Sequence, residues 1–111
     1  LDAHAVVLAS PIYWFNISAQ LKLAVDRTYA LIKDDSYLLS GKRIGLVFSY
    51  GDKDPVASGT INAIRSFQDA FSYIGCPIAG IVYGSANDPG EISSQKELLK
   101  EAEELGVTLM S

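Results

Sequence analysis

The sequence predicts an α/β fold in which a parallel sheet carries helices on both faces. Three apolar runs, at residues 5–9, 43–49 and 78–83, are typical of strands that are covered on both sides. Each run is followed by a longer segment in which apolar residues recur every three or four positions. Because strands that alternate with helices are joined by right-handed crossovers, the three strands should lie parallel in one sheet.

The first strand and the first helix are predicted from the first 33 residues. The run at 5–9 contains two β-branched residues and ends at a Ser-Pro pair. We expect the helix to begin near Ile17 with Ser18 or Asn16 as its cap, because a short side-chain oxygen can accept from the free amides of the first turn. The apolar stripe of this helix is predicted to be Leu21, Val25, Thr28 and Ile32.

The second strand, at 43–49, leads into a helix with clear signals at both ends. Asp54 is the expected cap and Pro55 the first helical residue, a position where the missing proline amide costs nothing. Gly75 is expected to end the helix. The apolar stripe between these signals is predicted to be Ile61, Ile64, Phe67, Phe71 and Ile74.

The third strand, at 78–83, is followed by a polar loop and a last helix. Ser94 and Glu97 have the spacing of a capping box, in which each side chain satisfies the other residue's backbone amide. Gly106 is expected to end this helix. The predicted apolar face is Leu98, Leu99, Ala102 and Leu105.

Composition excludes several classes of protein. With 111 residues and 49% hydrophobic residues, the chain forms one domain at most and can bury a core. Its nine basic residues are scattered and its net charge is -4, which argues against a nucleic-acid surface. No apolar run reaches the roughly 20 residues of a membrane span, and no secretory leader pattern is present. We therefore expect a cytoplasmic protein that binds neither membrane nor nucleic acid.

Cysteine and histidine are too few for several kinds of site. Cys76 is the only cysteine, so this chain alone forms no disulfide or cysteine metal cluster, and we interpret Cys76 as a small buried residue. His4 is the only histidine and lies near the wrong end of the first strand for catalysis. A Ser-His-Asp set is therefore not expected, and no metal site is predicted.

The most informative segment is the stretch between the first strand and its helix. Ligands of open α/β sheets bind beyond the carboxyl ends of the strands. Here three consecutive aromatic residues, Tyr13, Trp14 and Phe15, precede a helix start whose free amides favour an electron-rich partner. A flat ligand would explain why three aromatic residues stand in this loop. The alternative is that these rings cap the core or fill an oligomer interface.

The loop after the second strand is the next candidate. Tyr50 offers a hydroxyl and Gly51 permits a close approach of the backbone to a ligand. The alternative interpretation is an ordinary connecting loop. The loop at 84–90 is a weaker candidate for ligand binding than the other two loops.

The segment SPIYWFNISAQLKLAVDR strongly resembles the third-strand motif of NAD(P)H-dependent FMN reductase-like flavoproteins. This family includes multimeric flavodoxin-like quinone reductases and iron-sulfur flavoproteins. The elements that carry the resemblance are Ser10-Pro11, Tyr13-Trp14, Gln20-Leu21-Lys22 and Asp26-Arg27. Later segments support it, notably the Gly-Lys pair before the second strand and the Tyr-Gly pair that ends the third.

The resemblance implies an FMN-dependent oxidoreductase that passes electrons from NAD(P)H to a quinone or another small acceptor. Backbone amides of the first loop would bind the polar edge of the flavin ring while an aromatic side chain shields one face. No acid–base residue is expected to be indispensable, because the redox chemistry belongs to the cofactor. The implied cofactor-binding residues are Pro11, Ile12, Tyr13, Trp14, Phe15, Asn16, Ser18, Tyr50 and Gly51.

The resemblance also implies that residues 1–111 are a partial flavodoxin-like domain. They match the third to fifth strands of a sheet ordered 2-1-3-4-5, without the first two strands and the phosphate-binding loop. The chain starts at Leu1, not at methionine, which is how a fragment or processed chain begins. We expect it to oligomerise across the open strand edge or to need a companion segment. The alternative function is a non-catalytic flavin carrier, or a truncated remnant that serves as an association domain.

Overall fold

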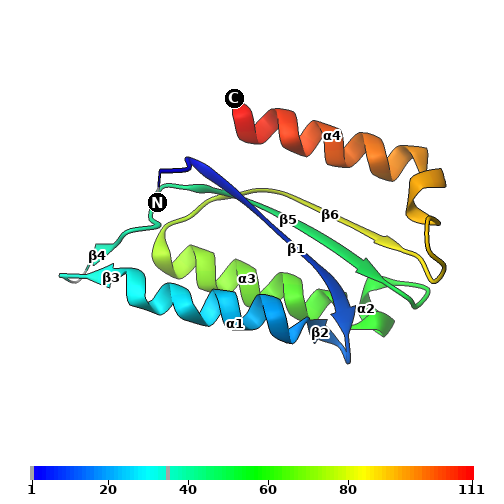
Figure 1. Ribbon diagram of the computed structural model, residues 1–111, viewed down its shortest axis with the longest axis horizontal. Coiled ribbons are helices and arrows are strands. Elements are labelled where there is room, and N and C mark those ends of the chain that lie inside the picture. Colours follow the sequence, from blue (N-terminus) through cyan, green and yellow to red (C-terminus); the bar gives the residue numbers. More distant parts are fainter. Residues whose placement is uncertain (1, 35) are drawn as a thin grey trace.

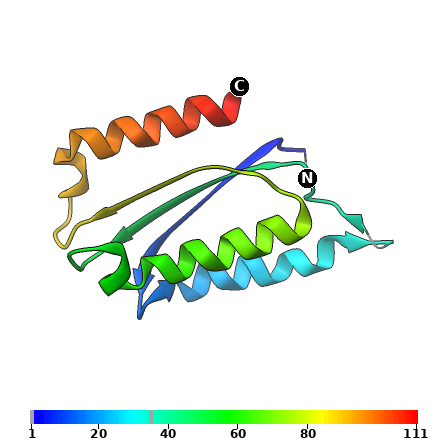
Figure 2. The same ribbon diagram turned by 180° about the vertical axis from the view of Figure 1, so that it is seen from behind.

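A computed structural model describes residues 2–34 and 36–111, so Leu1 and Asp35 lie outside the described part. Three layers are formed, with the sheet between one helix on one face and two on the other (Figure 1). The view from behind shows the same arrangement (Figure 2). The predicted α/β fold is confirmed. Its principal elements are β1 (Ala5–Tyr13), α1 (Ala19–Arg27), β5 (Arg43–Tyr50), α3 (Thr60–Ile74), β6 (Ile78–Ser85) and α4 (Lys96–Met110).

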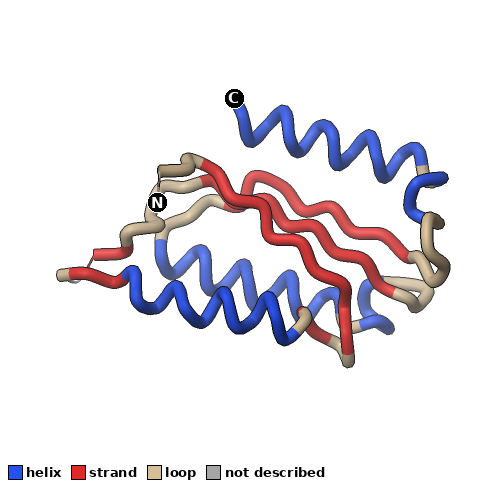
Figure 3. The backbone as a smooth tube through the Cα atoms, viewed as in Figure 1, coloured by secondary structure: helices blue, strands red, loops and turns tan. Residues whose placement is uncertain are grey.

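The sheet has the order β2-β1-β5-β6, and its three long strands are parallel as predicted. Figure 3 shows these strands in red, side by side between the helices. The fourth strand, β2 (Asn16–Ile17), is short and pairs antiparallel with the end of β1. The sequence interpretation ended the first strand at Ala9 and expected a loop up to Asn16. This was wrong, because β1 continues to Tyr13 and turns back through two residues.

A second correction concerns the end of the first helix. Ser18 caps α1 as predicted, since its side chain accepts a bond from the amide of Leu21. The predicted helix was nevertheless too long, because its apolar pattern was followed to Ile32 and α1 ends at Arg27. A 3-10 turn, η1 (Thr28–Leu31), follows α1, and a small hairpin of β3 (Ile32–Lys33) and β4 (Ser36–Tyr37) comes next.

The second helix is interrupted near its start. Asp54 caps α2 (Pro55–Ser58) through two amide bonds of 2.8 Å, as the sequence predicts. Gly59 then adopts a φ of 85° and separates α2 from α3. The described residues therefore form four α-helices where the sequence predicts three. Gly75, with a φ of 77°, ends α3 as expected.

The last helix differs from its prediction at both ends. A 3-10 turn, η2 (Ile92–Ser94), precedes α4, and the capping box is absent because the cap position is Gln95 and makes no side-chain cap bond. Gly106 lies inside the helix, which continues because Leu109 packs on the sheet. The packed side chains of α4 are Leu98, Leu105 and Leu109, whereas Leu99 and Ala102 are exposed.

Two apolar clusters hold the layers together. The larger lies between the sheet and α1 and α3, and it includes Leu46 together with three phenylalanine rings. Phe48, Phe67 and Phe71 stack in succession, with ring centroids 6.1 and 5.6 Å apart. The smaller cluster lies under α4, where Val82 contacts the leucines of the helix. Cys76 is buried in the larger cluster, as predicted.

One edge of the sheet is paired only in part. Among the described residues, the outer side of β1 pairs with β2 at Ile12 and Tyr13 and with no strand further back. Val7, in the middle of β1, is 51% exposed although it belongs to an apolar run. No described helix is both long and apolar enough to span a bilayer.

Candidate functional site at the carboxyl edge of the sheet

The three loops that follow the long strands meet at one edge of the sheet. The register pairs Pro11 of β1 with Ser49 of β5, and Tyr50 of β5 with Ser85 of β6. Because the strands are parallel, their carboxyl ends lie together, where ligands of such sheets bind. The predicted site residues of the first two loops therefore come from neighbouring strands.

The first loop is a tight hairpin, which we call the aromatic turn, and it consists of residues 13–16. Tyr13 pairs with Asn16, and the two residues between them reverse the chain. Trp14 has a φ of 48° and Phe15 a φ of 70°, the left-handed values that such turns usually give to Asn and Gly. Bulky residues in this conformation are strained by about 1–3 kcal/mol each. Strain of this kind is typical of ligand-binding segments.

The side chains of the aromatic turn lie outside both core clusters. Trp14 is 92% exposed and Tyr13 62%, so neither ring caps the core. The rings of Trp14 and Phe15 lie 5.7 Å apart at an angle of 60°. Among the described residues, neither the Trp14 amide nor the Phe15 amide donates a hydrogen bond. Two unmatched donors beside aromatic faces suit a planar ligand with an acceptor-rich edge.

A pair of buried serines connects the end of β1 to the start of α1. The amide of Ser18 donates to Oγ of Ser10 at 2.9 Å, and Oγ of Ser18 accepts from the amide of Leu21. The hydroxyl of Ser18 is therefore engaged in capping the helix. Ser10 was missed as a site residue, although its place directly after the apolar run was a signal for it. Both serines fix the base of the aromatic turn.

The second loop combines a buried tyrosine with a crowded glycine. Tyr50 lies beside Tyr83, with ring centroids 6.4 Å apart. Burial raises the pKa of the Tyr50 hydroxyl, and Tyr83 and Asp54 raise it further, so the group is a neutral donor at pH 7. Gly51 lies close to the side chain of Asn87, since a Cβ there would lie 2.8 Å from Oδ1 of Asn87 and would require that side chain to move.

The third loop is organised by one carboxylate. Oε2 of Glu91 accepts from the amides of Asn87 and Asp88 at 2.6 and 3.1 Å. The loop also contacts the second one, because Oγ of Ser85 donates to the carbonyl of Asp52 at 2.7 Å. Glu91 therefore fixes the backbone of Asn87, whose side chain lies against Gly51, and Ser85 links the third loop to the second.

The third loop is expected to loosen in acid. Hydrogen bonds from the amides of Asn87 and Asp88 lower the pKa of Glu91 below its ordinary value of 4.5. Because folding lowers this pKa, the stability that the Glu91 carboxylate contributes is complete above pH 4.5. It is lost as the pH falls through the pKa of the folded state. NMR shifts of the two amides should follow one titration with a midpoint below 4.5, which Glu91→Gln abolishes. A midpoint at or above 4.5 would contradict these contacts.

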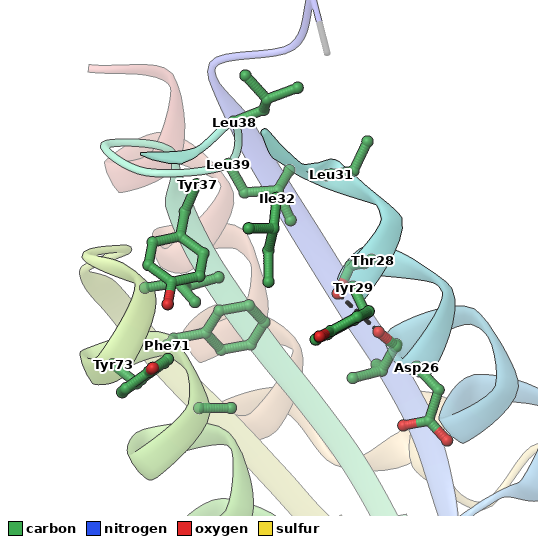
Figure 4. A pocket seen from close by; sticks show the side chains of 13 residues that line it. Asp26, Thr28, Tyr29, Leu31, Ile32, Tyr37, Leu38, Leu39, Phe71 and Tyr73 are labelled. Atoms are coloured by element: carbon green, nitrogen blue, oxygen red, sulfur yellow. Dashed lines mark hydrogen bonds between the residues drawn. The ribbon is translucent and has the colours of Figure 1, made fainter. Parts of the chain in front are cut away.

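The molecule also has a pocket of about 510 Å³ at the opposite edge of the sheet. Figure 4 shows its lining, with Phe71 and Tyr73 from α3 facing Ile32 and Tyr29 from the segment after α1. Tyr37 meets Tyr73 edge to face, with ring centroids 5.6 Å apart. The pocket lies where the strands begin, so it is separate from the three loops of the candidate site.

Comparisons with known proteins agree with this geometry. The family model for the flavodoxin-like fold matches residues 1–109. A Bacillus subtilis protein, YwqN, whose name describes an NAD(P)H-dependent FMN-containing oxidoreductase, is 30% identical over 109 residues. An iron-sulfur flavoprotein of Archaeoglobus fulgidus is 31% identical over 108 residues. Each alignment covers 95% of this chain, but the chain spans only 60% of the first protein and 44% of the second.

Solved structures show the same relation. A Trp repressor binding protein from Bacillus subtilis has a TM-score of 0.81 and 32% identity, covering 94% of this chain and 65% of its own. An NADPH-quinone reductase from P. pentosaceus has a TM-score of 0.67 and 25% identity, covering 87% and 63% respectively. The backbone of this chain thus corresponds to nearly two thirds of each structure.

Proposed function

The chain belongs to the family with the flavodoxin-like fold, and on that premise we propose that it binds FMN and takes part in electron transfer from NAD(P)H to a quinone or another small acceptor. The relatives named as an FMN-containing oxidoreductase, a flavoprotein and a quinone reductase support the proposal. The resemblance found in the sequence between Ser10 and Arg27 indicates the same chemistry.

The observation that carries the proposal is the donor set of the aromatic turn. Its two unmatched amides, from Trp14 and Phe15, lie at the carboxyl edge of the sheet beside exposed rings. Reduced flavin gains negative charge at one edge of its ring system, and fixed amides directed there would stabilise that charge. The residues present therefore fit a flavin ring.

Within the proposed site, the roles of this chain's residues are to bind and to orient. The amides of the aromatic turn would hold the polar edge of the ring, and Tyr13 or Trp14 would cover one face. Tyr50 and Gly51 would approach the ring from the second loop, with Glu91 holding that loop in place through Asn87. FMN itself would supply the redox chemistry, so none of these side chains needs to exchange a proton.

Titration with FMN tests the proposal directly. Binding is expected to quench both the flavin fluorescence and the emission of Trp14, which is the only tryptophan of the chain. The visible flavin spectrum should shift at the same midpoint. The variant Glu97→Gln, on the exposed first turn of α4 and outside the three loops, serves as a control and should bind equally. Unchanged spectra up to high micromolar FMN would contradict flavin binding.

A second candidate function is association, favoured by the open edge of β1. In the part of the chain that the structure describes, no strand pairs with the outer side of β1 before Ile12, and Val7 is exposed there. The exposed residues of α4 include apolar ones, namely Leu99, Val107 and Met110. We propose that a further strand pairs with this edge, supplied by a companion segment or by another copy of the chain.

Turnover and FMN binding together separate an oxidoreductase, a flavin carrier and an association domain. An oxidoreductase consumes NAD(P)H when FMN and a quinone are added, and the rate is measured as loss of absorbance at the nicotinamide band. A flavin carrier binds FMN without this turnover. A pure association domain does neither.

A further inference from the structure

We propose that Gly59 and Asn62, at the junction of α2 and α3, are positioning residues that hold the aromatic turn in its strained conformation. Neither residue lies in the three loops that follow the strands. Both contact Phe15, whose amide is one of the two unmatched donors. The contact is independent of any ligand, whereas its consequence for flavin binding rests on the proposed function.

Gly59 brings the junction against the backbone of the turn. A Cβ placed on Gly59 would lie 2.4 Å from Cα of Phe15, 2.6 Å from its Cβ and 2.7 Å from its carbonyl oxygen. Real Cβ atoms essentially never approach other atoms so closely. Because Gly59 has no side chain, the junction of α2 and α3 can pack directly against the backbone of the aromatic turn.

Asn62 fixes the orientation of the turn. Its Nδ2 donates to the carbonyl oxygen of Phe15 at 3.1 Å, and its own amide donates to the carbonyl of Gly59 at 2.9 Å. One side chain thus connects the junction to the carbonyl that leaves the turn. Because a peptide unit is planar, holding this carbonyl also holds the orientation of the whole Phe15–Asn16 peptide plane.

The junction itself is firm enough for this role. The hydroxyls of Ser58 and Thr60 lie 2.8 Å apart on either side of Gly59, and both residues are buried. Left-handed Trp14 and Phe15 persist only when their surroundings over-determine them. The contacts at Gly59 and Asn62 provide that constraint from a segment 47 residues away in the chain.

The variant Asn62→Ala removes the side chain, and Asn62→Asp keeps its shape but replaces the donor by a charged carboxylate, which cannot donate to a carbonyl. Gln68→Ala, an exposed amide on the same helix, is the matched control. Time-resolved fluorescence anisotropy of Trp14 reports the mobility of the turn in the free chain. Affinity for added FMN, measured by fluorescence, reports its consequence.

Both Asn62 variants should increase the rapid local decay of Trp14 anisotropy, and Gln68→Ala should not. The dissociation constant for FMN should rise roughly two- to ten-fold, as expected for one lost hydrogen bond. Increased mobility in a chain whose wild type fails to bind FMN would support the positioning role and overturn the proposed function. Unchanged Trp14 mobility in both variants would overturn the positioning role, whatever the flavin affinity.

Discussion

Replacing Phe67 by alanine is expected to lower the free energy of unfolding by about 3–5 kcal/mol, the usual cost of deleting a buried aromatic ring. Phe67 is 3% exposed and lies between the rings of Phe48 and Phe71 in the larger core cluster. Its interplanar angles of 8° and 18° show that both neighbours stack on it. The cavity would therefore remove contacts to the sheet and to α3 together.

Urea denaturation followed by far-ultraviolet circular dichroism measures this loss. Gln68→Ala changes the adjacent exposed position of the same helix and should stay within about 0.5 kcal/mol of the wild type. A loss below about 1 kcal/mol for Phe67→Ala would contradict the stacked core. Because the stability of a domain of this size is marginal, the expected loss is a large share of its total free energy of unfolding.

The variant Gly59→Ala is expected to disrupt the aromatic turn for two separate reasons. An alanine is strained at the φ of 85°, by about 1–3 kcal/mol. Its Cβ would also overlap the backbone of Phe15, which cannot rotate away as a side-chain tip can. We expect Gly59→Ala to lose more stability than the backbone strain alone costs, and to lose FMN binding.

Two other glycines separate these causes. Gly41 and Gly90 have φ values of 85° and 80°, but a Cβ on either would have no atom within 4 Å. Gly41→Ala and Gly90→Ala should therefore lose only the stability that the strained backbone costs. Thermal unfolding compares all three variants, and FMN titration compares Gly59→Ala with Gly41→Ala, because Gly90 lies in the third loop of the candidate site. Equal losses in all three would show that Gly59 does not support the turn.

Much of the fold could be predicted because its signals are local. The three apolar runs became the three long strands, and Ser18 and Asp54 cap helices as their side chains require. The family resemblance between Ser10 and Arg27 led to the same fold family as the comparisons. These features depend on neighbours in the sequence, so a single chain reveals them.

The missed features depend on tertiary contacts. The reversal at Trp14 and Phe15 carries no Asn-Gly signal, since the left-handed conformation there is imposed from outside the turn. Gly59 lies within a helical pattern, and its φ of 85° separates the two helices at a point where a Cβ would meet the backbone of Phe15. The capping-box spacing at Ser94 was overridden because η2 occupies that segment and α4 starts later.

The candidate site was predictable by residue type and not by geometry. Aromatic residues after a buried strand indicated a flat ligand. Their exposure and unmatched amides required coordinates, as did the link from Glu91 through Asn87 to Gly51. The cofactor-binding roles of these residues remain predictions for the experiments above.

Pairing of a further strand with the half-paired border of β1 would make folding of this chain subject to mass action. A strand that adds to Val7 and its neighbours would bind the native state and not the unfolded one, so its free energy of binding adds to stability. If that strand comes from a second molecule, the melting temperature becomes a function of protein concentration. Stability values for this chain are then comparable only at matched dilution.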